Sequence, residues 1–367
     1  MDISEQIKDV LSQYDLGELL AYEKNERGFV NKSFAIDVIQ SGIIQRYFLR
    51  QYKRGIKPEE LIFEHSMISH LVAKKYPPVA QVYRTRDGKT YVEKPGGEAG
   101  DEPVYFAIFD YLSGDDRYTW VDPKCNEVEI IRSAEILAQF HSAVSDYIPT
   151  GRRAEPEILA LLPTIPQIAG KCHLLSKHTL FDTYLVDNLP LIEEEVAQTI
   201  SSLGHISQEI PRVIIHCDYH PGNLKFDGEE VVGLFDFDWS KVDYRCFDFG
   251  LAAFYIFTDW EESSDGRLRL EPFGVFLEAY QDECAKHHCI PPLTGEELRL
   301  LPAMIRAGNL YILNWTILDY YGKEVDPEEY HQYLKHGIET IKWLKIGENA
   351  RKLANKINQY NWGNRIE

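Results

Sequence analysis

The sequence predicts an α+β fold of two lobes, in which a small antiparallel sheet crossed by one helix precedes a larger, mostly helical lobe. The 367 residues exceed the size at which one hydrophobic core usually stops growing, so we expect two lobes. Short runs of aromatic and β-branched residues fill the chain up to residue 112, and helical periodicity dominates the rest. Hydrophobic residues make up 44% of the chain and charged residues 26%, which is ordinary globular usage and excludes a disordered chain.

The first lobe is predicted to begin with a short amphipathic helix over residues 2–22. Strands are expected over Phe34–Val38 and Arg46–Tyr52, with a Ser-Gly turn that joins them into a hairpin. Pro58 followed by two glutamates is typical of a helix start, and apolar residues then recur at helical spacing. One helix therefore follows the hairpin.

Three further strands and a change of pattern complete this lobe. Short strands are predicted over Ala80–Tyr83 and Thr90–Glu93, on either side of an Arg-Asp-Gly-Lys turn, and a third over Tyr105–Leu112. We place the hinge near residues 108–114, so that residues 1–112 form the N-terminal lobe and residues 113–367 the C-terminal lobe. In the second lobe we expect a helix and two strands within the following ranges: Ile130–Ser142, Val213–Ile215 and Val231–Phe237.

The net charge and the cysteines limit the classes of partner and the cellular compartment that we expect. A net charge of −19 repels nucleic acids and anionic membranes, so any anionic ligand needs a local cationic cluster or a metal. Six scattered cysteines without a CxxC pair, and an N-terminus without the basic residues of a signal peptide, predict a reduced, cytoplasmic protein. The apolar run Leu251–Phe257 is too short to span a bilayer. Oligomeric state is not predicted.

The densest chemical signal is HCDYHPGN at His216–Asn223, followed by GLFDFDW at Gly233–Trp239. Asp218 and Asn223 lie five residues apart across a Pro-Gly turn, which can direct both side chains into one cleft. Asp236 follows an apolar strand. Carboxylate and amide oxygens without clustered cysteines suit Mg²⁺ bound together with substrate phosphates.

Phosphoryl transfer requires this set of groups. We assign Asp218 as the base that orients and deprotonates the attacking hydroxyl, and Asn223 with Asp236 as ligands of Mg²⁺ bound to ATP. The spacing of Asp218 and Asn223 equals that of the protein-kinase catalytic loop, and Asp236 occupies the place of the D-F-G aspartate. The sequence departs from that pattern at Cys217, and at Phe237, which is followed by Asp rather than Gly.

The two motifs together resemble the aminoglycoside phosphotransferase and choline kinase superfamily, which implies a bilobal protein-kinase-like fold and an ATP-dependent kinase. The resemblance covers Arg27 to Gly250, and within the superfamily it is closest to the homoserine kinase type II-like and bacterial stress-response kinase branches. It implies a nucleotide-covering loop over Arg27–Ile36 that contains Gly28. His216 is expected to hydrogen-bond the loop backbone rather than transfer protons, and the role of His220 is left open.

The same resemblance implies four more nucleotide contacts. Arg50 falls at the position of the phosphate-binding lysine, with Lys53 as the alternative if the strand register differs. Glu64 matches the helix glutamate that pairs with this cation. Asp110 and Leu112 lie in the segment whose backbone binds adenine.

The acceptor remains open. Residues 308–321 supply aromatic side chains and Asp319, which suit a cationic amine, although a packed helix explains the same pattern equally well. The leading hypothesis is a kinase acting on a hydroxyl of a small molecule, namely an amino acid, amino alcohol or sugar. The alternatives are a Ser/Thr protein kinase of the bacterial stress-response type and a nucleotide-binding pseudokinase or scaffold. The Cys and His residues at 284–289 are interpreted as a polar helix end rather than a zinc site.

Overall fold

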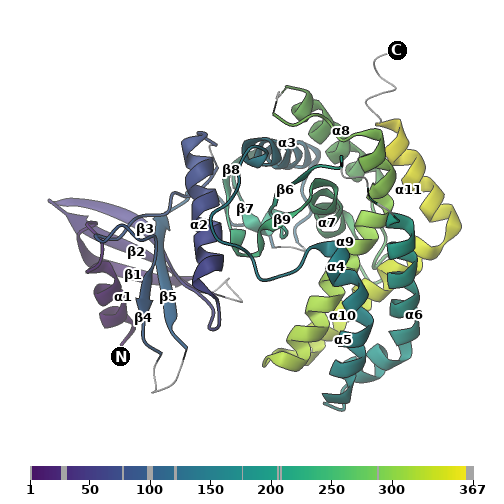
Figure 1. Ribbon diagram of the computed structural model, residues 1–367, viewed down its shortest axis with the longest axis horizontal. Helices are drawn as coiled ribbons and strands as arrows, with labels where there is room; N and C mark the ends of the chain where they lie inside the picture. Colours follow the sequence, from purple (N-terminus) through teal and green to yellow (C-terminus); the bar gives the residue numbers. More distant parts are fainter. Residues whose placement is uncertain are drawn as a thin grey trace.

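The structure is a computed structural model, in which a five-stranded sheet at one end faces a large helical part at the other, with helix α2 between them (Figure 1). It describes residues 2–25, 31–76, 78–96, 102–119, 122–175, 177–204, 206, 209–286 and 289–360. This architecture confirms the predicted α+β fold class.

The N-terminal sheet is antiparallel throughout, in the order β1-β2-β3-β5-β4. The predicted hairpin is present, and Ser41 and Gly42 at its tip have φ angles of 51° and 80°, as in the two-residue turns that suit the twist of paired strands. The strands are β1 (Glu18–Asn25), β2 (Lys32–Gln40), β3 (Ile43–Gln51), β4 (Val92–Lys94) and β5 (Val104–Asp110).

One helix covers each face of this sheet. Helix α1 (Ile3–Leu11) buries Ile7, Val10 and Leu11 against one face, and α2 (Pro58–Ala73) packs its apolar side on the other. The prediction of a single helix over residues 2–22 was wrong in its length, because the chain turns at Gly17 and continues as edge strand β1. Gly17 has φ of 108°, and a Cβ there would lie 2.3 Å from the Ile39 carbonyl oxygen, so only glycine permits this turn.

The strand expected over Ala80–Tyr83 was also wrong. This segment makes one isolated bridge, from Val82 to Phe109, flanked by backbone hydrogen bonds with Ile108 and Asp110. It contacts only the end of β5 that β4 leaves unpaired, since β4 pairs with residues 104–106, and this contact is too short to form a strand. The strand predicted over Thr90–Glu93 begins two residues later, as β4.

The C-terminal part holds two small two-stranded sheets within a set of helices. Strand β6 pairs with β9 and β8 pairs with β7. Strands β6 and β8 were predicted from the sequence, whereas their partners β9 and β7 were not. The elements are α3 (Glu127–Val144), α4 (Ile158–Leu161), α5 (Ile165–Cys172), α6 (Leu180–Leu203), β6 (Arg212–Ile215), β7 (Leu224–Asp227), β8 (Glu230–Leu234), β9 (Lys241–Tyr244), α7 (Arg245–Phe257), α8 (Leu270–Lys286), α9 (Gly295–Gly322), α10 (Pro327–Lys345) and α11 (Gly347–Gln359). Within the described ranges, no helix is both long and apolar enough to cross a membrane.

Helices α7 and α9 cross closely because a glycine from each lies at the contact. A Cβ on Gly250 would approach the carbonyl carbon of Met304 to 2.7 Å, and one on Gly308 would approach the Cα of Leu251 to 3.0 Å. Real Cβ atoms do not tolerate backbone atoms at the first of these distances, so the depth of this crossing requires Gly250.

We expect Gly250→Ala to lower the free energy of unfolding by about 1–3 kcal/mol, because the added methyl group forces α7 away from α9. Urea unfolding followed by circular dichroism measures the effect. Gly170→Ala in α5 is the matched control, since a Cβ there meets nothing within 4 Å and alanine favours a helix by up to about 1 kcal/mol. Equal stability of Gly250→Ala and Gly170→Ala would contradict the packing argument.

Candidate active site

The HCDYHPGN segment forms the loop between β6 and β7, and GLFDFDW runs from β8 into the loop before β9. Both loops leave short strands at the side of the C-terminal part that faces the N-terminal sheet (Figure 1). Two residues in them, Cys217 and Asp236, have left-handed backbones, with φ of 63° and 66°. A left-handed non-glycine residue is costly and persists only where its surroundings hold it in place.

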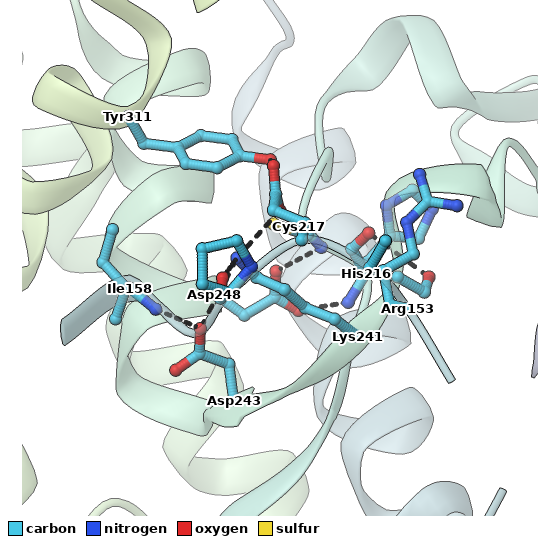
Figure 2. A network of polar contacts seen from close by, with 12 residues as sticks. Arg153, Ile158, His216, Cys217, Lys241, Asp243, Asp248 and Tyr311 are labelled. Atoms are coloured by element: carbon cyan, nitrogen blue, oxygen red, sulfur yellow. Dashed lines mark hydrogen bonds and ion pairs between the residues drawn. The ribbon is translucent and has the colours of Figure 1, made fainter. Parts of the chain in front are cut away.

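A buried carboxylate on α7 holds the first loop. The backbone amides of His216 and Cys217 donate to Asp248, one to each carboxylate oxygen, both at 2.8 Å, and Figure 2 shows both amides directed at it. His141 Nε2 lies 3.0 Å from the same carboxylate. Burial alone would raise the pKa of Asp248, but the hydrogen bond from His141 and the contacts with His216 outweigh it and lower that pKa.

The two histidines near Asp248 are structural. Burial lowers the pKa of His141 and of His216, so both rings are neutral near pH 7. Because a carboxylate only accepts, His141 Nε2 carries the proton and Nδ1 accepts from Tyr280 at 2.8 Å. His216 Nε2 donates to the Phe235 carbonyl at 3.0 Å and so ties the first loop to the second.

Behind the first loop, a buried lysine joins three parts of the C-terminal region (Figure 2). Lys241 Nζ lies 2.8 Å from Glu155 and 3.6 Å from Asp243. The hydroxyl of Tyr311 on α9 donates to Glu155 at 3.1 Å. Strand β9, α9 and the segment before α4 are thereby fixed around Cys217.

Asp218 and Asn223 are in direct contact. Asn223 Nδ2 donates to the backbone carbonyl of Asp218 at 2.8 Å and to its carboxylate at 2.9 Å. His220 Nε2 lies 3.6 Å from that carboxylate. Burial would raise the pKa of Asp218, but His220 and a hydrogen bond with Tyr255 lower it, so the carboxylate is charged and able to accept a proton.

Asp236 faces the N-terminal sheet, where Arg50 on β3 bridges two carboxylates. One guanidinium nitrogen of Arg50 lies 3.2 Å from Glu64 on α2, and another lies 3.3 Å from Asp236. Burial and the nearby Asp238 raise the pKa of Asp236 well above its usual value, with Arg50 acting in the opposite direction. Arg50 thus links the two lobes across the cleft.

Two cavities meet at these residues. The first, of about 190 Å³, is lined by the apolar residues Phe48, Ile68, Ala80, Phe109 and Leu234, and also by Asp110, Leu112 and Lys225. The second, of about 560 Å³, is lined by Asp218 and His220 and by residues of α9 and α10. Both cavities share Ser33, Arg50, Gly222, Asn223 and Asp236.

The oxygen atoms at this junction fit a hard divalent cation. Asp236 Oδ1 is buried and accepts no hydrogen bond from the described residues, and its ion pair is with Arg50 at 3.3 Å. Asn223 donates through its amide nitrogen to Asp218, which leaves its amide oxygen as the ligand atom. One carboxylate and one amide oxygen where the two cavities meet are a donor set that suits Mg²⁺.

The structure brings seven of the eight predicted site residues to the two cavities, namely Arg50, Glu64, Asp110, Leu112, Asp218, Asn223 and Asp236. The eighth, Gly28, lies outside the described residues. The Asp110 side chain is already engaged, because it accepts from the amide of Gln81 at 3.1 Å and from the hydroxyl of Tyr83 at 2.7 Å. Any contact of Asp110 with a base would therefore be made by its backbone.

Sequence reasoning missed most of the second cavity's wall. Trp315 and Asp319 from the α9 segment line it, but Tyr311 and Tyr320 are core residues. Tyr255, Tyr330 and Tyr333 also line the cavity, and no motif marks them. Asn31 was missed too, although it donates to Asp238 at 2.9 Å and accepts from the amide of Lys53 at 2.9 Å.

The chain belongs to the phosphotransferase enzyme family (APH), whose family model matches residues 23–282. A homoserine kinase of Afipia carboxidovorans is 25% identical over 347 residues, which are 92% of this chain and 94% of that protein. Among solved structures, amicoumacin kinase in complex with AMP-PNP, Ca²⁺ and Ami has a TM-score of 0.64 at 15% identity, covering 93% of this chain and 94% of that one. Choline kinase from Cryptosporidium parvum has a TM-score of 0.62 at 12% identity, covering 98% and 99%. These findings confirm the resemblance, the fold and the phosphotransferase class predicted from the sequence.

We expect Asp248→Asn to lower the free energy of unfolding by about 1–3 kcal/mol. The new amide nitrogen would face a backbone N–H group of His216 or Cys217, which now donates to a carboxylate oxygen. Urea unfolding at pH 7 measures the loss. The lowered pKa means that Asp248 stabilises the folded state fully above its usual pKa of about 4, and less as pH falls through the folded value. The difference in free energy of unfolding between the wild type and Asp248→Asn should therefore become smaller below about pH 4. A constant difference down to pH 2 would contradict the assignment of charge to Asp248.

Proposed function

We propose that this protein transfers the γ-phosphoryl group of Mg-ATP to a hydroxyl of a small molecule, an amino acid, amino alcohol or sugar. The supporting observation is the division of the cleft. Leu112 and Lys225 line only the first cavity, Asp218 lines only the second, and Asn223 with Asp236 line both. A nucleotide in the first cavity would direct its terminal phosphate to the junction, where an acceptor from the second cavity would meet it.

In this proposal each residue has a separate task. Asp218 orients the acceptor hydroxyl and takes its proton as the oxygen bonds to the γ-phosphorus, while the bond to the β–γ bridging oxygen breaks and ADP leaves. Asn223 and Asp236 would hold the Mg²⁺ ion, which would neutralise charge on the phosphate oxygens. Arg50, held by Glu64, contributes a cation to the phosphates.

The size of the second cavity favours a small acceptor. Trp315 and Asp319 of α9 and Tyr330 and Tyr333 of α10 line it, and its volume of about 560 Å³ lies in the range of small-molecule sites. Helices α5 and α6, from the long segment 150–203, pack against α9. Among the described residues that line the cavity, none comes from this segment.

The homoserine kinase names of the relatives make homoserine the first acceptor to test. We expect purified protein to release ADP from Mg-ATP when one acceptor is added from a panel of homoserine, choline, ethanolamine, aminosugars, aminoglycosides and a generic protein substrate. Asp218→Ala should lower this rate by about 10²–10⁴-fold, because general-base catalysis typically contributes that factor. Asp227→Ala, at the exposed last residue of β7, is the matched control.

Binding of Mg-ATP, measured by calorimetry, should survive in Asp218→Ala. Stimulation by the protein substrate alone would favour the protein-kinase alternative. Nucleotide binding without turnover on any acceptor would favour a scaffold, and failure to bind Mg-ATP would overturn the proposal.

A further inference from the structure

Two cations lie against one aromatic ring beside the second cavity. Lys53 Nζ is 4.3 Å from the centre of the Trp239 ring, and the guanidinium carbon of Arg153 is 5.5 Å from it. Lys53 follows β3 in the N-terminal part, whereas Arg153 precedes α4 in the C-terminal part. The cleft therefore brings together two positive charges from the two lobes, and we call them the Trp239 cations.

Both cations have hydrogen-bond donors to spare. Arg153 has a side chain that is only 5% exposed, and its one ion pair is a distant contact with Glu60 at 3.5 Å. Its Nε is buried without a hydrogen-bond partner. Lys53 makes no ion pair within 4.0 Å among the described residues, and an aromatic face does not satisfy the three N–H groups of an ammonium.

Besides Glu60, Asp238 attracts both Trp239 cations, but in the described part of the chain it makes no ion pair within 4.0 Å with either. Asn31 donates to Asp238 Oδ2 at 2.9 Å, and Asp238 Oδ1 is buried without a hydrogen-bond partner among the residues that the structure describes. Burial lowers the pKa of Lys53, and repulsion from Arg153 and Lys323 adds to that effect against the attraction of Asp238 and Glu60. A buried donor without an acceptor, such as Arg153 Nε, is costly, so an anion that supplies acceptor atoms would stabilise this cluster.

The position of this cluster relates it to the acceptor. Trp239, Asp238 and Asp319 line the second cavity, whereas the two cations lie behind this lining, on the Trp239 ring. Trp239 packs edge-on against Trp315 at 4.7 Å, so the ring that carries the cations continues into the aromatic wall. A ligand of the second cavity would thus contact Trp239, the ring that both cations contact.

We propose that Lys53 and Arg153 form a subsite for a carboxylate of the acceptor, so that the acceptor is a hydroxylated amino acid rather than a plain amino alcohol. This inference rests on the proposed function and narrows its substrate class. The acidic and aromatic wall of Asp319, Tyr330 and Tyr333 suits the ammonium group of the same molecule. The Trp239 cations and this acidic and aromatic wall would together hold the charged end of the acceptor while its hydroxyl reaches Asp218.

The test compares two acceptors that differ by one carboxylate, L-homoserine and 3-aminopropan-1-ol. We expect Lys53→Gln and Arg153→Gln each to raise KM for homoserine by about 10- to 100-fold, the worth of a charge-assisted hydrogen bond of about 1.5–3 kcal/mol. KM for 3-aminopropan-1-ol and for Mg-ATP should stay within about twofold. Lys57→Gln and Arg152→Gln change exposed cations in the same two segments and should leave all three KM values unchanged.

Two kinetic outcomes would overturn the subsite. An equal rise of KM for both acceptors would show that the cations do not bind the carboxylate of homoserine. A rise confined to Mg-ATP would assign the cations to a phosphate of the nucleotide. Arg153→Lys, which keeps the charge, should recover part of the homoserine affinity if Arg153→Gln folds poorly.

Calorimetry separates this inference from the proposed function. If the wild type phosphorylates neither acceptor, homoserine is titrated into wild type and Lys53→Gln in the presence of Mg²⁺ and a non-hydrolysable ATP analogue. If the wild type binds homoserine and Lys53→Gln does not, the carboxylate subsite is supported even though the catalytic proposal fails. Absence of binding by the wild type overturns the subsite.

Discussion

The geometry of the candidate site depends on the buried carboxylate of Asp248. It accepts two consecutive amides of the first loop, and this arrangement holds Cys217 in its left-handed conformation directly before Asp218. A loop with such a backbone would relax to other conformations without a fixed acceptor for its N–H groups. Because Asp248 sits on α7, a helix of the core, the position of the proposed base is set by the packing of the C-terminal part rather than by the loop itself.

A second constraint comes from the opposite lobe. Arg50 contacts both Glu64 and Asp236, so one side chain relates β3, α2 and the second loop. Buried carboxylates near one another repel, and an arginine with several directional donors can offset two of them at once. The cleft is therefore a place where charges from both lobes balance, and this explains why polar atoms such as Asp236 Oδ1 remain there without hydrogen bonds.

The sequence predicted those parts of the fold and the site whose signals are local. The hairpin around Ser41, the start of α2 at Pro58 and the set Asp218, Asn223 and Asp236 each carry their information within a few residues. Strands β7 and β9 lacked such a signal, since each has four residues and is defined by its partner. The wall formed by Tyr330 and Tyr333 was also hidden, because only tertiary packing brings α10 to the cleft. The lobe boundary near residues 108–114 and the roles of the site residues stay predictions.

The close crossing of α7 and α9 has a consequence for how acceptor preference can change. Gly250 lies two residues beyond Asp248 on α7, and α9 carries Trp315 and Asp319 on the cavity side. The helix that anchors the catalytic loop and the helix that meets the acceptor therefore form one rigid frame. Side chains on the cavity side of α9 can vary without displacing Asp218, whereas changes on the side that faces Gly250 would shift the catalytic loop. The acceptor preference can therefore change through the cavity-side residues of α9 while the residues that carry out phosphoryl transfer keep their positions.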